Sequence, residues 1–307
     1  MERTASGVTV TGAKRRAAVR RELTAWSFVV PALVGLIIFV YGPLVYSLFI
    51  SFTSWDLLTP ARWTGLSNYA RAFRDDTFIR CMSNTVFFVI SIVPSGIVLA
   101  MAMAIALNRR GRGTGFFRAA FYMPSITSTV AVGLVWLWIF NPDKGVINSL
   151  LKLVGVRSLP QWLESVIWAK PALSLMRVWQ VSGYYMIMYL TGLQNIPKEL
   201  YEAAEIDGAG AVKKFLHLTL PLLAPTTFFL TITGIISSFK VFGSINVMTK
   251  GGPGYATYTI LYYIYTQAFE RYRMGYASAM AWMLFAILFV ITIIQFRARN
   301  KREEAGY

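Results

Sequence analysis

Charged side chains are scarce in this sequence. They make up only 14% of its 307 residues, about half the share that is usual for a soluble domain. Hydrophobic residues make up 56%, and the mean hydropathy is +0.52. This composition excludes an ordinary soluble enzyme or binding domain and predicts a membrane protein.

Several reactive groups are also scarce or missing. One cysteine and one histidine leave no internal disulfide and little room for His-based chemistry or a metal cluster. Gly208-Ala209-Gly210 followed by Lys213 lacks the spacing of a phosphate-binding loop, and we find no Walker motif elsewhere. No acidic residue lies at the centre of an apolar stretch, so a proton relay lacks its usual groups. We therefore expect a transport subunit rather than an enzyme, with no cofactor and no metal of its own.

Six apolar stretches are long enough to cross a membrane. Backbone groups in lipid must bond within the protein, and these stretches do not alternate as barrel strands do, so we predict helices. The expected fold class is an all-α membrane protein with transmembrane helices at 26–52, 85–107, 117–140, 172–193, 218–242 and 277–296. The first stretch is too long for the apolar part of a cleavable signal, roughly 7–15 residues, and should remain as an anchor. The segment 258–269 is shorter and is predicted to be an interfacial or packed helix.

Basic residues predict the topology. The net charge is +16, and the bases cluster in short segments beside the spans, which favours membrane lipid over nucleic acid as their partner. Their density is roughly twice as high in 1–25, 108–116, 194–217 and 297–307 as in 53–84, 141–171 and 243–276. Both termini are therefore expected in the cytoplasm. The expected units are a basic N-terminus at 1–25, a first helix and outer loop at 26–84, a five-helix core at 85–296 and a basic tail at 297–307.

The loop 194–217 is the most distinctive segment. Its sequence predicts a short helix that starts near Pro197 and ends at Asp207-Gly208, where glycine supplies the backbone angles of a tight turn. In order and spacing, the segment closely resembles the cytoplasmic EAA loop of permease subunits in binding-protein-dependent ABC importers. The matching residues are Glu202, Ala203, Ala204, Asp207, Gly208, Ala209, Gly210, Phe215 and Pro221.

This resemblance implies the coupling mechanism and the partners. In that family the loop is the contact through which separate ATPase subunits drive the permease, so ATP and Mg²⁺ would bind to two partner ATPases and not to this chain. An external solute-binding protein would deliver the solute. The location implied is the plasma (inner) membrane of a bacterium. Six helices without a recognisable repeat also predict a second permease subunit, because they supply half of a two-fold pore.

A second motif, 248–253, narrows the family. Its Met-Thr-Lys-Gly-Gly-Pro sequence resembles the Gly-Gly-Pro stretch of the carbohydrate-importer permeases, in particular of the larger maltose-type subunit. The chain lacks that subunit's extra N-terminal helices and large outer domain. The resemblance implies a sugar or oligosaccharide as solute. Another solute such as glycerol phosphate, or a stand-alone secondary transporter, remain the alternatives.

Polar side chains in the fourth and fifth spans are candidates for the solute path. Aromatic faces suit sugar C–H surfaces, while hydroxyl and amide groups bind sugar hydroxyls. The candidates are Trp179, Gln180, Tyr184, Tyr185, Ser237, Ser238, Lys240 and Asn246. For any one of them taken alone, helix packing is the favoured interpretation. Arg118, Arg177 and Lys240 lie near the ends of spans, where we expect their long side chains either to reach the interface or to pack against neighbouring helices rather than to serve transport.

Overall fold

The computed structural model describes residues 9–109 and 111–304, and helices dominate these two stretches. Parts of the predicted basic segments 1–25 and 297–307, and Arg110, lie outside them. Here η marks a π-helical turn. The first half contains α1 (Thr9–Leu36), η1 (Ile37–Tyr41), α2 (Gly42–Ser51), β1 (Thr53–Ser54), β2 (Arg62–Trp63), α3 (Ser67–Phe73), α4 (Asp76–Leu107), α5 (Thr114–Ile126), α6 (Thr129–Ile139) and α7 (Val146–Leu153). The second half contains α8 (Ala169–Gln194), α9 (Lys198–Ile206), α10 (Ala211–Lys214), η2 (Phe215–Thr219), α11 (Leu220–Leu222), α12 (Ala224–Phe239), α13 (Gly243–Met248), α14 (Ile260–Tyr265), η3 (Thr266–Glu270) and α15 (Met274–Glu304).

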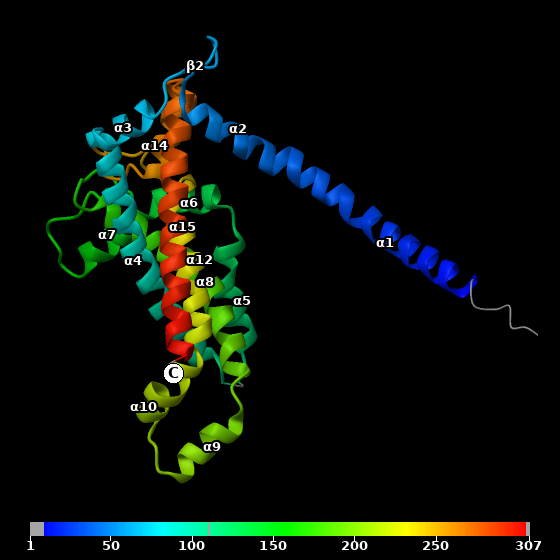
Figure 1. Cartoon of the computed structure of the whole chain (residues 1–307). Coiled ribbons are helices and arrows are strands. Elements are labelled where there is room, and N and C mark those ends of the chain that lie inside the picture. The colour runs from blue at the N-terminus through cyan, green and yellow to red at the C-terminus, as the bar shows by residue number, and fades with distance from the viewer. Residues whose placement is uncertain (1–8, 110, 305–307) are drawn as a thin grey trace, which may run out of the picture.

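Five helices form the body of the molecule: α4, α5, α8, α12 and α15 run side by side (Figure 1). We call the end that carries α9 and α10 the hairpin end, and the opposite end, with α3 and the antiparallel β1–β2 pair, the loop end. The segments 108–116 and 194–217 both lie at the hairpin end. This agrees with the prediction that the two segments are on the same side of the membrane.

Helix α8 lies at the centre of the bundle and packs against α4, α5 and α12. One core cluster surrounds Leu173 towards the loop end, and the other surrounds Tyr189 towards the hairpin end. Small residues allow the close approach of α5 and α8: a Cβ atom on Gly183 would collide with the Phe121 carbonyl oxygen. Close backbone packing of this kind replaces the hydrophobic drive that is missing between helices in lipid.

The predicted spans fall on helices, but two of them are not straight. Among the described residues, Thr24–Ser51, Asp76–Leu107 and Met274–Arg299 are long and apolar enough to cross a membrane as single helices. The predicted helix at 117–140 is instead two helices, α5 and α6, which meet at 102°. The predicted helix at 218–242 contains a second break at Leu223, where the α10–α11 segment and α12 meet at 61°.

The breaks have local causes. Thr127 and Ser128 are extended, with ψ values of 143° and 130°, so the α-helical path cannot continue through them. The second break lies at Leu223, just before Pro225 in the first turn of α12, which has no N–H to bond to the carbonyl four residues earlier. The fourth predicted span, α8, has 26 residues but is less apolar than the three single-helix spans. It tolerates polar residues because half of its residues are buried among neighbouring helices.

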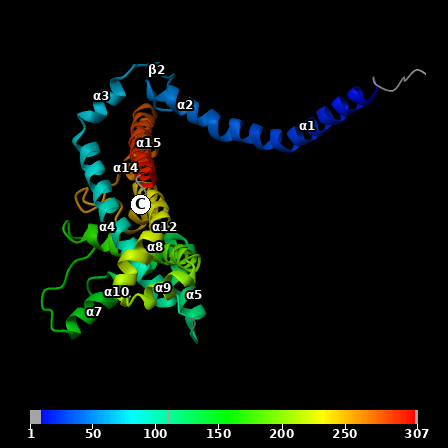
Figure 2. The ribbon, with the colours of Figure 1, turned by 60° about the horizontal axis from the view of Figure 1, so that its bottom comes forward.

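The first predicted span forms an arm that leaves the bundle. Helices α1, η1 and α2 continue into one another and extend away from the body, as both views show (Figures 1 and 2). In the most apolar 18-residue stretch of this arm no residue is buried, and Phe28 and Phe39 are 80% and 78% exposed. The arm's main contacts with the body are made by α2, with α15 and β1. So much apolar surface must be covered by lipid or by another protein.

Candidate functional site

The segment 194–217 forms a helical hairpin that projects beyond the bundle (Figure 1). Pro197 precedes the first turn of α9, where its missing N–H is no loss. The helix ends at Asp207, and Gly208 follows with φ +72°, a left-handed conformation that glycine adopts without strain. The turn is closed by a 2.8 Å hydrogen bond from the Ala209 N–H to the Ala204 carbonyl. The structure therefore forms the helix and break that the sequence predicted.

Two contacts hold the arms of this hairpin together. The Lys214 Nζ atom lies 2.6 Å from Glu205 Oε1, so α10 is tied to the end of α9. The Tyr201 hydroxyl and the Thr219 hydroxyl are 2.9 Å apart and tie the start of α9 to η2. Phe215 packs against the core cluster around Tyr189. The hairpin is thus a braced unit joined directly to the bundle, and its second arm leads through η2 and α11 into α12.

The exposed surface of the hairpin is more apolar than its sequence motif indicates. Ile206 is 88% exposed and Val212 is 72% exposed, although both lie in a polar loop outside the bundle. Glu202, Ala203, Asp207, Gly208, Gly210 and Pro221 are also exposed, whereas Ala204, Ala209 and Phe215 are partly buried. Sequence reasoning missed Ile206 and Val212 as contact residues. The sequence did contain a signal for these two residues, because large apolar side chains in a water-exposed turn indicate a protein partner.

The Gly-Gly-Pro motif forms a tight loop at the loop end, after α13. Lys250, Gly251 and Gly254 all have positive φ, at 49°, 82° and 53°. A Cβ atom on Gly251 would collide with the Tyr258 ring, so only glycine fits there. The Thr257 hydroxyl donates to the Gly252 carbonyl at 2.8 Å and closes the loop. The motif is therefore explained by backbone geometry.

The predicted solute-path residues divide by exposure. Gln180, Tyr185 and Ser238 are buried within the chain. The others are exposed on this chain, wholly or in part: Trp179, Tyr184, Ser237, Lys240 and Asn246. Among the described residues, no hydrogen bond or ring contact links a candidate on α8 to a candidate on α12 or just after it. The structure therefore does not bring the eight residues together into one site. Exposed polar groups on a membrane-embedded helix are unfavourable in lipid, and this indicates a covered or water-filled surface.

Two arginines near the ends of spans bond within the protein. Arg177 turns into the protein: its Nη1 donates to Gln180 Oε1 at 2.6 Å, and its Nε is buried without a hydrogen-bond partner. Arg118 likewise donates to the Leu107 carbonyl at 2.7 Å, at the end of α4. Of the two expected arrangements, both therefore adopt packing against the helices rather than extension to the interface. In the described part of the chain no carboxylate pairs with Arg177, which leaves a guanidinium within the bundle without a counter-ion. No group of three His, Cys, Asp or Glu that could hold a metal occurs in residues 9–109 and 111–304.

Comparison with known proteins decides the family. Residues 96–301 match the model of the "Binding-protein-dependent transport system inner membrane component" family. The chain belongs to this family. It is 39% identical to the "Probable ABC transporter permease protein YesP" of Bacillus subtilis, over 94% of each chain. It is 33% identical to the "Lactose transport system permease protein LacF" of Rhizobium radiobacter, over 92% of this chain and 96% of that one. It is 31% identical to the "sn-glycerol-3-phosphate transport system permease protein UgpA" of Agrobacterium fabrum, over 93% and 97%.

Solved structures agree on the permease fold. A chain of "a bacterial ABC transporter involved in the import of the acidic polysaccharide alginate" superposes with a TM-score of 0.80 at 23% identity, over 94% of this permease and 99% of that chain. The predictions of an ABC importer permease and of its all-α fold are confirmed. This permease is a multi-pass membrane protein and a transport subunit.

Proposed function

We propose that this permease carries a sugar or a sugar-derived solute inwards and that the α9–α10 hairpin couples it to a separate ATPase. The hairpin carries the proposal: a braced helix-turn outside the bundle presents Ile206 and Val212 to a partner. The names of relatives that transport lactose and sn-glycerol-3-phosphate support the solute class. Glycerol phosphate or a similar solute is the second candidate, because UgpA is nearly as similar as LacF.

The partners follow from what this chain leaves incomplete. An apolar arm that its own chain does not cover fits a second, related permease subunit. Two ATPase subunits bind ATP and Mg²⁺, and this chain binds neither. An external solute-binding protein delivers the solute at the loop end. The hairpin end and both termini face the cytoplasm of a bacterial cell, across its plasma membrane.

We place the solute path along α8 and the end of α12, where exposed polar candidates lie. Trp179 and Tyr184 are exposed on α8, and Ser237 and Lys240 are exposed at the end of α12. Arg177 is added to this set, because a guanidinium in a span with no counter-ion offers donors to a hydroxyl or an anionic oxygen. Such donors suit both a sugar and a sugar phosphate.

Reconstitution tests the proposal. Proteoliposomes are prepared with this permease, its partner permease and the binding protein, with and without the ATPase subunits, and uptake of labelled solute is measured. We expect uptake only with the ATPases and ATP. Equal uptake without them would indicate a secondary transporter and contradict the proposal. A variant lacking the exposed apolar contact, Ile206→Ser with Val212→Ser, should assemble poorly with the ATPases while it still inserts in the membrane.

A further inference from the structure

A basic pocket lies at the loop end of the molecule, away from the hairpin. It has a volume of about 670 Å³ and lies between α3, the start of α4 and the turn from η3 to α15. Four arginines line it, Arg71, Arg74, Arg271 and Arg273, together with Asp75 and Tyr263. We call it the arginine pocket. Its four cations come from two segments that are about 200 residues apart in sequence, so the fold brings them together.

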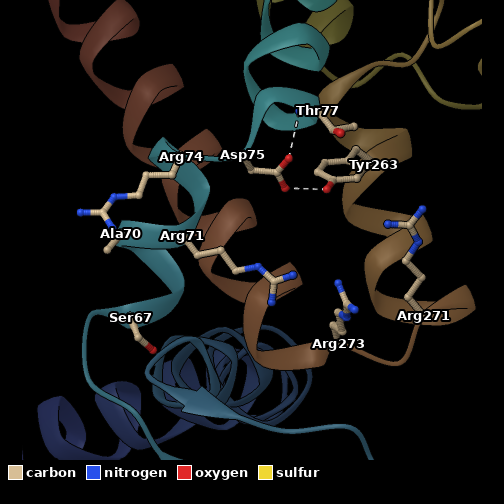
Figure 3. A pocket seen from close by; sticks show the side chains of 9 residues that line it. All are labelled: Ser67, Ala70, Arg71, Arg74, Asp75, Thr77, Tyr263, Arg271 and Arg273. Carbon is tan, nitrogen blue, oxygen red and sulfur yellow. Dashed lines mark hydrogen bonds between the residues drawn. The ribbon is translucent and has the colours of Figure 1, made fainter.

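The side chains are arranged around an open space. Arg71 and Arg273 extend from opposite walls towards one another, while Arg271 lies on the same wall as Tyr263 and Arg74 points away from the centre (Figure 3). The Arg71 guanidinium lies 4.7 Å from the centre of the Tyr276 ring, and this cation–π contact restrains it. Like charges held near one another repel, so an anion that binds between them is favoured.

Asp75, the acidic residue that lines the pocket, already accepts hydrogen bonds from groups other than the arginines. Asp75 accepts hydrogen bonds from the Tyr263 hydroxyl at 2.6 Å and the Tyr276 hydroxyl at 2.7 Å. It also caps α4 by accepting from the Thr77 N–H at 2.9 Å. In the part of the chain that the structure describes, the single ion pair is Lys214–Glu205, so none of the pocket arginines is paired with an acid. The pocket therefore has an excess of positive charge.

We propose that the arginine pocket docks an acidic segment of the external solute-binding protein. The inference rests on the proposed function, which places the loop end outside the cell. Guanidinium groups bind carboxylates through paired hydrogen bonds, so several arginines call for several carboxylates. The volume far exceeds that of one carboxylate and suits a strand or turn of protein. Tyr272, between Arg271 and Arg273, is 52% exposed, and arginine with exposed tyrosine is typical of protein interfaces.

The test uses the complete transporter in nanodiscs of zwitterionic lipid. ATPase activity is measured while the solute-loaded binding protein is titrated, for the wild type, for the double variant Arg71→Gln with Arg273→Gln, and for Arg157→Gln. Arg157 is exposed in the loop after α7 and serves as the matched control. For the double variant we expect the concentration of half-maximal stimulation to rise about tenfold with an unchanged maximal rate, since it loses two charged contacts. The control should match the wild type.

Two further measurements keep the outcome clear. Raising the salt concentration from about 50 mM to about 500 mM should weaken the wild type more than the double variant, because the lost contacts are screened by salt. The conservative variant Arg71→Lys with Arg273→Lys should recover most of the affinity and checks that folding is intact.

If the wild type is stimulated and the double variant has the same half-maximal concentration, the docking inference is wrong. If the wild type is not stimulated at all, the proposed function itself fails. A defect that appears only when anionic lipid is added would assign the pocket to lipid headgroups instead.

Discussion

At the scale of single residues, backbone geometry explains the glycines of the hairpin better than their place in a motif does. Gly208 has φ +72°, whereas Gly210 has φ −67° and could be any residue. A Cβ atom would meet nothing within 4 Å at either position. The two glycines therefore separate the effect of backbone strain from the effect of side-chain volume.

Gly208→Val should uncouple the permease, because a β-branched residue resists the left-handed conformation by roughly 1–2 kcal/mol or more and distorts the turn. We expect a severalfold loss of ATP-driven uptake with normal membrane insertion. Gly210→Ala is the control and should transport normally. Normal uptake by Gly208→Val would show that the turn does not transmit the ATPase's motion.

A second prediction at this scale concerns the pKa of Asp75 and the stability that depends on it. Burial alone would raise the pKa of Asp75, but hydrogen bonds from Tyr263, Tyr276 and two backbone N–H groups outweigh it, and the pKa lies below its ordinary value. Because the folded pKa is depressed, its stabilising contribution is present above the unfolded value of about 3.9 and is lost as the pH falls through the folded pKa.

The thermal unfolding temperature should therefore fall below about pH 4 in the wild type. Asp75→Asn should lower it already at pH 7 and should weaken its dependence on acid. Tyr263→Phe removes one donor and should give a smaller loss at pH 7. An unfolding temperature that Asp75→Asn leaves unchanged at every pH would refute this account.

The solute path gives a third residue-scale prediction. Tyr184→Ala and Lys240→Ala each remove an exposed polar group from α8 or the end of α12, and Ser238→Ala removes a buried hydroxyl. A net hydrogen bond to a solute is worth roughly 0.5–1.5 kcal/mol, so uptake affinity should fall severalfold to tenfold while basal ATPase activity persists. Thr292→Ala in α15 is the control, since its hydroxyl bonds to its own helix at Leu288. If all three variants keep the wild-type affinity, these residues are packing groups and the path lies elsewhere.

At the scale of helices, the contact between α5 and α8 positions the central helix. The Ser125 hydroxyl donates to the Gln180 carbonyl at 2.8 Å and accepts from the Tyr184 N–H at 2.9 Å. Gly183 permits this approach, since a Cβ atom there would strike the Phe121 carbonyl. One hydroxyl and one missing side chain thus set the distance between two helices.

Gly183→Ala should destabilise the permease by about 1–3 kcal/mol, because overpacking forces α5 and α8 apart. In an open position of a helix, the same change is expected to stabilise by roughly 0.5–1 kcal/mol. Gly115→Ala in α5 is that control, since a Cβ atom there would meet nothing within 4 Å. Thermal unfolding in nanodiscs measures both, and equal unfolding temperatures would contradict the close packing.

At the scale of the whole molecule, the two ends differ in what they offer to partners. The hairpin end presents a rigid helix-turn, and the loop end presents the arginine pocket and the Gly-Gly-Pro loop. Leu58 at the loop end and Ile206 at the hairpin end are 86% and 88% exposed. Cys81 is fully buried, so thiol reagents should not label the native chain.

In sealed cells, an impermeant thiol reagent should label Leu58→Cys and should leave Ile206→Cys unlabelled until the cells are permeabilised. The reason is the proposed topology, in which basic segments remain on the cytoplasmic side. The two sites are equally exposed, so each controls for the other. Rapid labelling of Ile206→Cys in intact cells would reverse the orientation.

The sequence by itself determined the class, the family and the hairpin. Long apolar runs require helices in lipid, and the order of residues from Glu202 to Pro221 is enough to indicate the family. It also located the turn at Gly208, because local backbone angles depend mainly on local residues.

Only the tertiary structure decided which groups meet. Hydropathy placed α5 and α6 in one span, but the extended pair Thr127–Ser128 turns the chain by 102°. Sequence reasoning left Arg177 either at the interface or packed against helices, and the structure shows it packed towards Gln180. The arginine pocket joins residues near 71 with residues near 273, and a periodic pattern cannot report contacts across about 200 positions. Long-range packing is set by the whole fold, and a single sequence records it only indirectly.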